Sequence, residues 1–128
     1  MNSLIEKIFK LQENNTNLKS EFLGGFTSFI TMAYIIFVNP QIMSLSGMDQ
    51  GAVFVGTCLA AALACILMGL FANWPVGLAP GMGLNAFFAY TVVLKLGYSW
   101  EFALTAVLLE GLIFIALTFE LSFLILEI

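Results

Sequence analysis

The sequence predicts an all-α integral membrane protein with four transmembrane spans. Hydrophobic residues make up 61% of the 128 residues and charged residues 9%, whereas a soluble domain usually carries about 25% charged residues. The mean hydropathy is high, at +1.02. Half of the charged residues lie before Phe22, so the rest of the chain is nearly continuous apolar sequence. We therefore expect a multi-pass protein of the inner or plasma membrane, embedded in the lipid bilayer.

The composition also argues against other classes of protein. A nucleic-acid-binding surface needs a basic face, and four Lys and Arg residues against eight Asp and Glu residues do not provide one. We expect no nucleic-acid partner. The chain has no histidine and two cysteines, so a metal site is not expected either, since zinc sites are built mainly from these residues. We expect no cofactor and no enzymatic activity.

Residues 1–21 are predicted to form a cytoplasmic amphipathic segment, with an interfacial helix over residues 4–13. Apolar side chains fall on one arc of this helix, and charged side chains fall opposite. The alternative is a solvated tail without membrane contact. Three lysines precede the first span and none lies in the next two loops, so the positive-inside rule places the N-terminus in the cytoplasm.

Residues 22–128 are predicted to form the membrane domain. A helix needs about 20 mainly apolar residues to cross a bilayer, and four stretches meet this length, at about residues 22–43, 52–72, 76–94 and 102–126. Short segments with turn-forming residues connect them at residues 44–51, 73–75 and 95–101. An even number of spans places both termini on the cytoplasmic side.

The second span carries small residues in two rows with a spacing of four. The rows are Gly56, Ala60 and Ala64, and Thr57, Ala61, Cys65 and Gly69. Small residues allow helices to approach closely in lipid. Cys58 and Cys65 lie about 10 Å apart along the helix axis, which is too far for a disulfide. We interpret both cysteines as packing residues.

The third span is interrupted by residues that break helices. Proline removes a backbone donor and glycine weakens a helix, and residues 74–90 contain Pro75, Gly77, Pro80, Gly81 and Gly83. Non-helical backbone at membrane depth is tolerated only where it is buried in protein or lines a cavity. An interrupted span therefore indicates a transporter's binding site. We predict an extended stretch over residues 76–80, followed by a half-helix that starts near residues 83–85.

Asn85 lies at the predicted mouth of this half-helix. The free amides and the positive dipole end of a helix start point toward a ligand there. The Asn85 side chain offers one acceptor and two donors, which can pair with the edge of a nucleobase. Capping of the half-helix is the alternative role. Spacing alone favours capping, and the two roles are compatible.

Glu110 is the one ionisable residue near the middle of a predicted span. Burying a charge in a membrane is costly, so such residues are functional candidates. Proton relay is one role for Glu110. The alternative is a neutral or paired glutamic acid that stabilises helix packing.

Three motifs carry a family resemblance. They read Thr31-Met-Ala-Tyr-Ile-Ile-Phe-Val-Asn-Pro40, Ala52-Val-Phe-Val-Gly-Thr-Cys-Leu-Ala-Ala-Ala62 and Gly77-Leu-Ala-Pro-Gly-Met-Gly-Leu-Asn-Ala-Phe-Phe-Ala-Tyr90. Together they resemble the AzgA-like hypoxanthine/guanine/adenine permeases of the nucleobase-cation symporter-2 (xanthine/uracil permease) family. The similarity runs from about Leu4 to Thr118, and the third motif is highly specific.

The resemblance implies a transporter of fourteen spans in two inverted repeats, in which the third span is a short strand plus a half-helix. It implies proton-coupled symport of a purine nucleobase, such as hypoxanthine, guanine or adenine. Asn85 and Gly83 match positions used around the substrate, in a motif that also contains Gly81. Thr31 and Tyr34 belong to the side of the first span that faces the core.

After Thr118 the sequence departs from the family pattern. We interpret the chain as the N-terminal part of a permease, from a truncated, frameshifted or split gene, which is inactive without the missing C-terminal spans. Two alternatives stay open. One is a small four-span drug transporter that is coupled to protons and works as a homodimer. The other is a membrane fragment that transports nothing.

Overall fold

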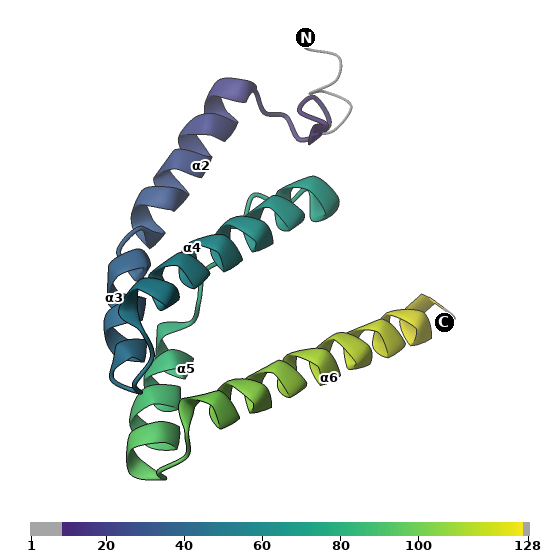
Figure 1. The fold of residues 1–128 in the computed structure, drawn as a ribbon. Coiled ribbons are helices and arrows are strands. Elements are labelled where there is room, and N and C mark those ends of the chain that lie inside the picture. Colours follow the sequence, from purple (N-terminus) through teal and green to yellow (C-terminus); the bar gives the residue numbers. More distant parts are fainter. Residues whose placement is uncertain (1–8, 127–128) are drawn as a thin grey trace.

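The structure is a computed structural model that describes the backbone of residues 9–126 and the side chains of residues 9–120. Its described part is helical and contains no β-strand. The helices, shown in Figure 1, are α2 (Leu18–Met32), α3 (Ile35–Ser44), α4 (Gln50–Leu67), η1 (Met68–Ala72), α5 (Met82–Ala86), η2 (Phe87–Lys95) and α6 (Trp100–Leu126), where η denotes a π-helix. The predicted all-α class is confirmed.

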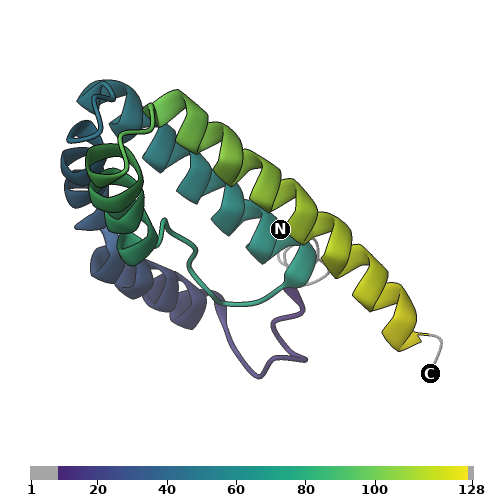
Figure 2. The same cartoon turned by 90° about the horizontal axis from the view of Figure 1, so that it is seen from below.

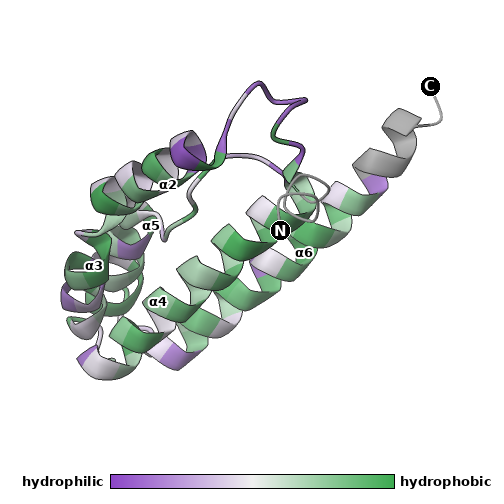
Figure 3. Cartoon of the chain, turned by 90° about the horizontal axis from the view of Figure 1, so that it is seen from above, coloured by the Kyte–Doolittle hydropathy of each residue, from purple (hydrophilic) through white to green (hydrophobic). Residues whose placement is uncertain are grey.

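Three stretches are long and apolar enough to cross a membrane. They cover Leu18–Ser44, Gln50–Ala72 and Trp100–Glu120. They correspond to the first, second and fourth predicted spans. The helix over Met82–Lys95 is shorter, with a length of about 21 Å at 1.5 Å per residue, so it cannot cross a hydrocarbon core of about 30 Å by itself. Apolar residues cover these helices in Figure 3, whereas polar residues gather in the loop before α2.

The first span differs from the prediction because it is broken into two helices. α2 ends at Met32 and α3 begins at Ile35, with a turn over residues 33–34. Hydroxyls in α2 bond to carbonyls of their own helix: Thr27 Oγ1 donates to Leu23 O and Thr31 Oγ1 to Ser28 O, each at 2.8 Å. Such back-bonding bends helices. Pro40 lies inside α3 and removes a further backbone donor from this span.

The first half of the predicted interfacial helix over residues 4–13 lies outside the described residues. Within the described part, Lys10 has a positive φ of 49° and residues 11–15 form a turn. The helix therefore does not continue to residue 13. Asn17 then starts α2, because its side chain accepts a hydrogen bond from the Ser20 amide at 3.0 Å and caps the helix.

The second span is continuous from Gln50 to Ala72 as α4 and η1. Asp49 caps its start, with the Asp49 Oδ1 atom accepting a hydrogen bond from the Ala52 amide at 2.7 Å. Asn73 ends the helix in the left-handed conformation, at φ 50° and ψ 38°. An open connection without helix then leads from η1 to α5, and it is visible in Figure 2.

The prediction of a strand in this connection is wrong. Residues 74–81 contain no helix and no strand in the described part of the chain. A β-strand exists only through the ladder of hydrogen bonds to a neighbouring strand, and the described residues offer none. The half-helix that follows is confirmed. It begins at Met82, slightly earlier than predicted, after Gly81 in an extended conformation (φ −76°, ψ 111°).

The apolar core is small and lies where α3, η2 and the first turn of α6 meet. Met43, Phe88 and Ala103 are buried there, and Val92, Trp100 and Leu104 are among the residues packed against them. Beyond this corner α6 departs from the other helices (Figure 1), and its large apolar side chains are exposed, such as Leu108 (64%) and Phe114 (71%). The chain therefore has few apolar contacts of its own.

Candidate functional site

A buried hydrogen bond joins the first and second spans. The Asn39 Nδ2 atom on α3 donates to the Thr57 Oγ1 atom on α4 at 2.8 Å. Both residues are buried, with 4% and 6% of their surface exposed. Such groups are costly unless they are hydrogen-bonded. Thr57 belongs to the predicted row of small residues, so the row both permits close packing and supplies this polar contact.

The half-helix of the third span joins the same network. The Asn85 Nδ2 atom donates to the Asn39 Oδ1 atom. Asn39 thus bonds to Thr57 with its amide nitrogen and to Asn85 with its carbonyl oxygen, so that the three side chains form a connected group. We call Thr57, Asn39 and Asn85 the polar triad. It links three spans through side chains alone, because the residues lie on α4, α3 and α5 respectively.

The triad orients the Asn85 side chain and uses only part of its hydrogen-bonding capacity. Asn85 is partly buried, and no other side-chain hydrogen bond of Asn85 occurs in the described part of the chain. Its carbonyl oxygen and its second amide hydrogen therefore remain available as one acceptor and one donor. Two adjacent groups of this kind can bind an edge of a planar heterocycle.

The structure contradicts the capping role of Asn85. The N-cap of the half-helix is Gly81, which makes no side-chain capping bond. Asn85 is the fourth helical residue, and its backbone amide already bonds to the Gly81 carbonyl at 3.1 Å. Sequence spacing suggested a cap because the helix was expected to start later. The side chain is instead directed to Asn39.

Gly81 and Gly83 flank the start of the half-helix. A methyl group added at Gly83 would contact nothing within 4 Å, and one added at Gly81 would lie 3.9 Å from the Leu84 Cδ1 atom. The backbone here is therefore openly accessible within the described part. The first amides of a helix lack intrahelical partners and form its positive end, so this end of the half-helix is suited to a polar or anionic group.

The remaining predicted residues lie on other elements than Asn85. Thr31 bonds to the Ser28 carbonyl within α2, and Tyr34 lies at the break between α2 and α3 with 56% of its surface exposed. Glu110 is exposed on α6, beyond the turn that packs on η2. No hydrogen bond in the described part joins any of the three to the polar triad.

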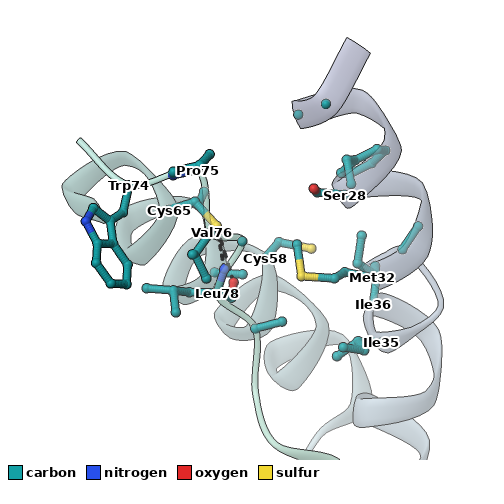
Figure 4. Close-up of a pocket in the computed structure, with 18 of the residues that line it drawn as sticks. Ser28, Met32, Ile35, Ile36, Cys58, Cys65, Trp74, Pro75, Val76 and Leu78 are labelled. Atoms are coloured by element: carbon teal, nitrogen blue, oxygen red, sulfur yellow. Dashed lines mark hydrogen bonds between the residues drawn. The ribbon is translucent and has the colours of Figure 1, made fainter. Parts of the chain in front are cut away.

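A cavity of about 740 Å³ reaches the triad at Thr57, whereas Asn39, Asn85 and the two glycines of the half-helix do not line it. Its walls come from α2 and α3, from α4 and from the non-helical residues 74–80, as Figure 4 shows. Thr57 belongs both to the triad and to this wall. Gly77 permits the close approach of α2, because a methyl group there would meet the end of the Met32 side chain, with the Met32 Sδ atom at 3.1 Å.

Sequence reasoning did not identify Asn39 and Thr57 as site residues. A signal was present for Asn39, which is a polar residue inside an apolar run and directly precedes Pro40. Polar residues inside a span mark functional positions or helix contacts. Thr57 offered no comparable signal, because its size explained its place in the row of small residues.

Comparison with known proteins identifies the family. A family model described as a permease family matches residues 19–127. The chain belongs to this permease family. It is 56% identical over 104 residues to an adenine permease of Escherichia coli, covering 81% of this chain and 23% of that protein. It is 50% identical over 123 residues to a guanine/hypoxanthine permease of Bacillus subtilis, covering 89% and 28%.

The comparisons confirm the resemblance to the purine permeases of the xanthine/uracil permease family. The family and the three long apolar helices together indicate a multi-pass membrane protein. The chain spans about a quarter of the length of the curated relatives it matches. No solved structure matches it.

The first prediction concerns the centre of the polar triad. Replacing Asn39 with alanine leaves the Thr57 hydroxyl and the Asn85 amide without this partner, so Asn39→Ala is expected to lower the free energy of unfolding by about 1–3 kcal/mol. Denaturant unfolding of the chain in detergent micelles measures the change. Gln41→Ala, exposed on the same helix, is the matched control, with an expected change within about 0.5 kcal/mol. Equal losses in both variants contradict the structural role of the triad.

Proposed function

We propose that this chain takes part in the transmembrane transport of purine nucleobases, with Asn85 contributing to the substrate site. The observation that carries the proposal is the fixed orientation of the Asn85 amide, whose carbonyl oxygen and second N–H are unpartnered in the described part of the chain. The matched relatives are named for adenine and for guanine/hypoxanthine. These bases all present adjacent donors and acceptors at their edges, which an asparagine amide can pair with.

The other proposed binding groups follow from the same half-helix. The open backbone at Gly81 and Gly83 supports a close approach of the substrate to the first helical amides. Thr31 and Tyr34 are proposed as residues of the first span on the substrate side. For these two the support is the family resemblance, since neither is hydrogen-bonded to the polar triad in the described part of the chain.

We further propose that transport is coupled to protons. Glu110 lies near the middle of the long apolar stretch Trp100–Glu120, whereas Glu101 and Glu120 lie at its ends. An acid at membrane depth can carry a proton. Its exposure on α6 leaves it accessible to a partner helix. The competing role for Glu110 is structural, as a neutral acid that bonds to such a helix.

The second prediction tests Asn85 directly. It uses a chimaera in which this chain replaces the matching segment of the Escherichia coli adenine permease and the rest of that permease is retained. Asn85→Ala removes one or two hydrogen bonds to the purine, worth about 0.5–1.5 kcal/mol each, and should raise the KM for labelled adenine about two- to tenfold or more. Leu94→Ala, exposed at the far end of the same helix, is the control. An unchanged KM across adenine, guanine and hypoxanthine contradicts the assignment.

The third prediction is that the 128 residues alone do not transport purines. The amides of Gly77 and Ala79 donate no hydrogen bond in the described part, and backbone groups at membrane depth need protein partners. Cells that lack purine permeases and express the isolated chain should accumulate labelled hypoxanthine no faster than cells with an empty vector. The chimaera above serves as the positive control. Saturable uptake that disappears in Asn85→Ala would instead support a compact, oligomeric transporter.

The fourth prediction concerns orientation in the membrane. We propose a cytoplasmic N-terminus, because Lys7, Lys10 and Lys19 precede the first span and lysines are retained on the cytoplasmic side. We also propose four crossings, which would return the C-terminus to the same side. A reporter that is active only in the cytoplasm, fused to either terminus, should therefore be active. Activity of a periplasmic reporter at residue 2 or at residue 128 contradicts the topology.

A further inference from the structure

Cys65 contacts the backbone of the broken third span with its thiol. The Leu78 amide donates to the Cys65 Sγ atom at 3.2 Å, and the Cys65 thiol lies 3.3 Å from the Leu78 carbonyl oxygen, to which it donates. Figure 4 shows the two residues next to each other in the lining of the cavity, with dashed lines for their hydrogen bonds. One side chain thus bonds to both polar groups of one residue, which is the pattern that a neighbouring strand would otherwise provide.

The position of this contact gives it a role beyond packing. Residues 74–81 have neither helix nor strand in the described part of the chain, so their backbone groups depend on side chains for partners. Within the described residues, the backbone of residues 74–80 is hydrogen-bonded in two places. The Val76 amide bonds to the Trp74 carbonyl, and Leu78 bonds to Cys65. Leu78 lies four residues before Met82, where the half-helix that carries Asn85 begins.

We propose that Cys65 is a positioning residue of the substrate site. Its thiol holds the extended segment against α4, and this fixes where the half-helix starts and where Asn85 lies. The thiol is a weak donor and a weak acceptor, which suits a contact that must hold the segment without making it rigid. The link to substrate binding rests on the function proposed above, whereas the contact itself does not.

Cys58 provides a matched comparison on the same helix. It also lines the cavity and is also partly exposed. Among the described residues it makes no hydrogen bond. The two cysteines therefore share the helix, the cavity and the side-chain type, and they differ in the contact with Leu78. A role in packing predicts similar behaviour for both, and a positioning role predicts a difference.

The first arm of the test needs no transport activity. The full chain, in membranes, carries Cys58→Ala and Ala79→Cys, together with either Cys65→Ser or Cys65→Ala, so that position 79 holds its single thiol. Serine retains a donor and an acceptor, whereas alanine has neither. We expect a maleimide to react with position 79 about two- to fivefold faster in the Cys65→Ala chain, because the segment is no longer tethered, which corresponds to a weak hydrogen bond.

The control for this arm has Leu94→Cys in place of Ala79→Cys, where the two Cys65 variants should react at equal rates. Equal rates at position 79 overturn the proposal. A difference at both positions also overturns it, because that result indicates general loosening of the fold rather than release of one segment.

The second arm measures adenine uptake by the chimaera described above. Cys65→Ala should raise KM about two- to fivefold, whereas Cys65→Ser and Cys58→Ala should stay within about twofold of the parent. Immunoblots correct Vmax for the amount in the membrane. A lower Vmax with unchanged KM, or equal KM values for Cys65→Ser and Cys65→Ala, contradicts a positioning role. If no chimaera transports adenine, the proposed function fails in this setting, and the alkylation rates still decide the role of Cys65.

Discussion

The structure depends on the requirement that backbone polar groups at membrane depth find partners within the protein. Helices meet this requirement internally, and the first, second and fourth spans do so over most of their length. The third span cannot, because its prolines and glycines prevent a continuous helix over residues 74–81. Its partners must therefore come from neighbouring elements, and α4 supplies one at Cys65. The break in the third span thereby explains why Cys65 in the second span bonds to backbone groups.

Polar contacts define the arrangement of the spans more than apolar packing does. The buried core consists of a few residues at one corner, and the large side chains along α6 are exposed. In lipid, apolar surface gives little driving force for helix association, so small residues and hydrogen bonds must specify which helices meet. The polar triad provides this specification, since Asn39 cannot bond to both Thr57 and Asn85 unless three spans lie in one relative position.

The sequence predicted the features that depend on local composition. Apolar length located the three stretches that are long enough to cross a membrane, and Pro80 with Gly81 located the start of the half-helix to within a few residues. It failed where structure depends on distant partners. The strand in the third span needs a second strand, which the described residues lack. The break at residues 33–34 falls at neither a glycine nor a proline, so no local residue type marked it. Asn39 and Thr57 were missed because the role of each depends on the hydrogen bond between them, which the sequence does not show.

The row of small residues on α4 unites these observations. Thr57, Ala61 and Cys65 recur every fourth residue, and all three line the cavity next to the third span. Thr57 holds the half-helix through Asn39, and Cys65 holds the extended segment through Leu78. The two attachment points are about 12 Å apart along the helix at 1.5 Å per residue. Since the half-helix is attached to α3 and the extended segment to α4, the relative position of the two halves of the broken span depends on how α3 and α4 pack against each other. A displacement of α4 against the first span would therefore move the backbone support of the half-helix relative to Asn85.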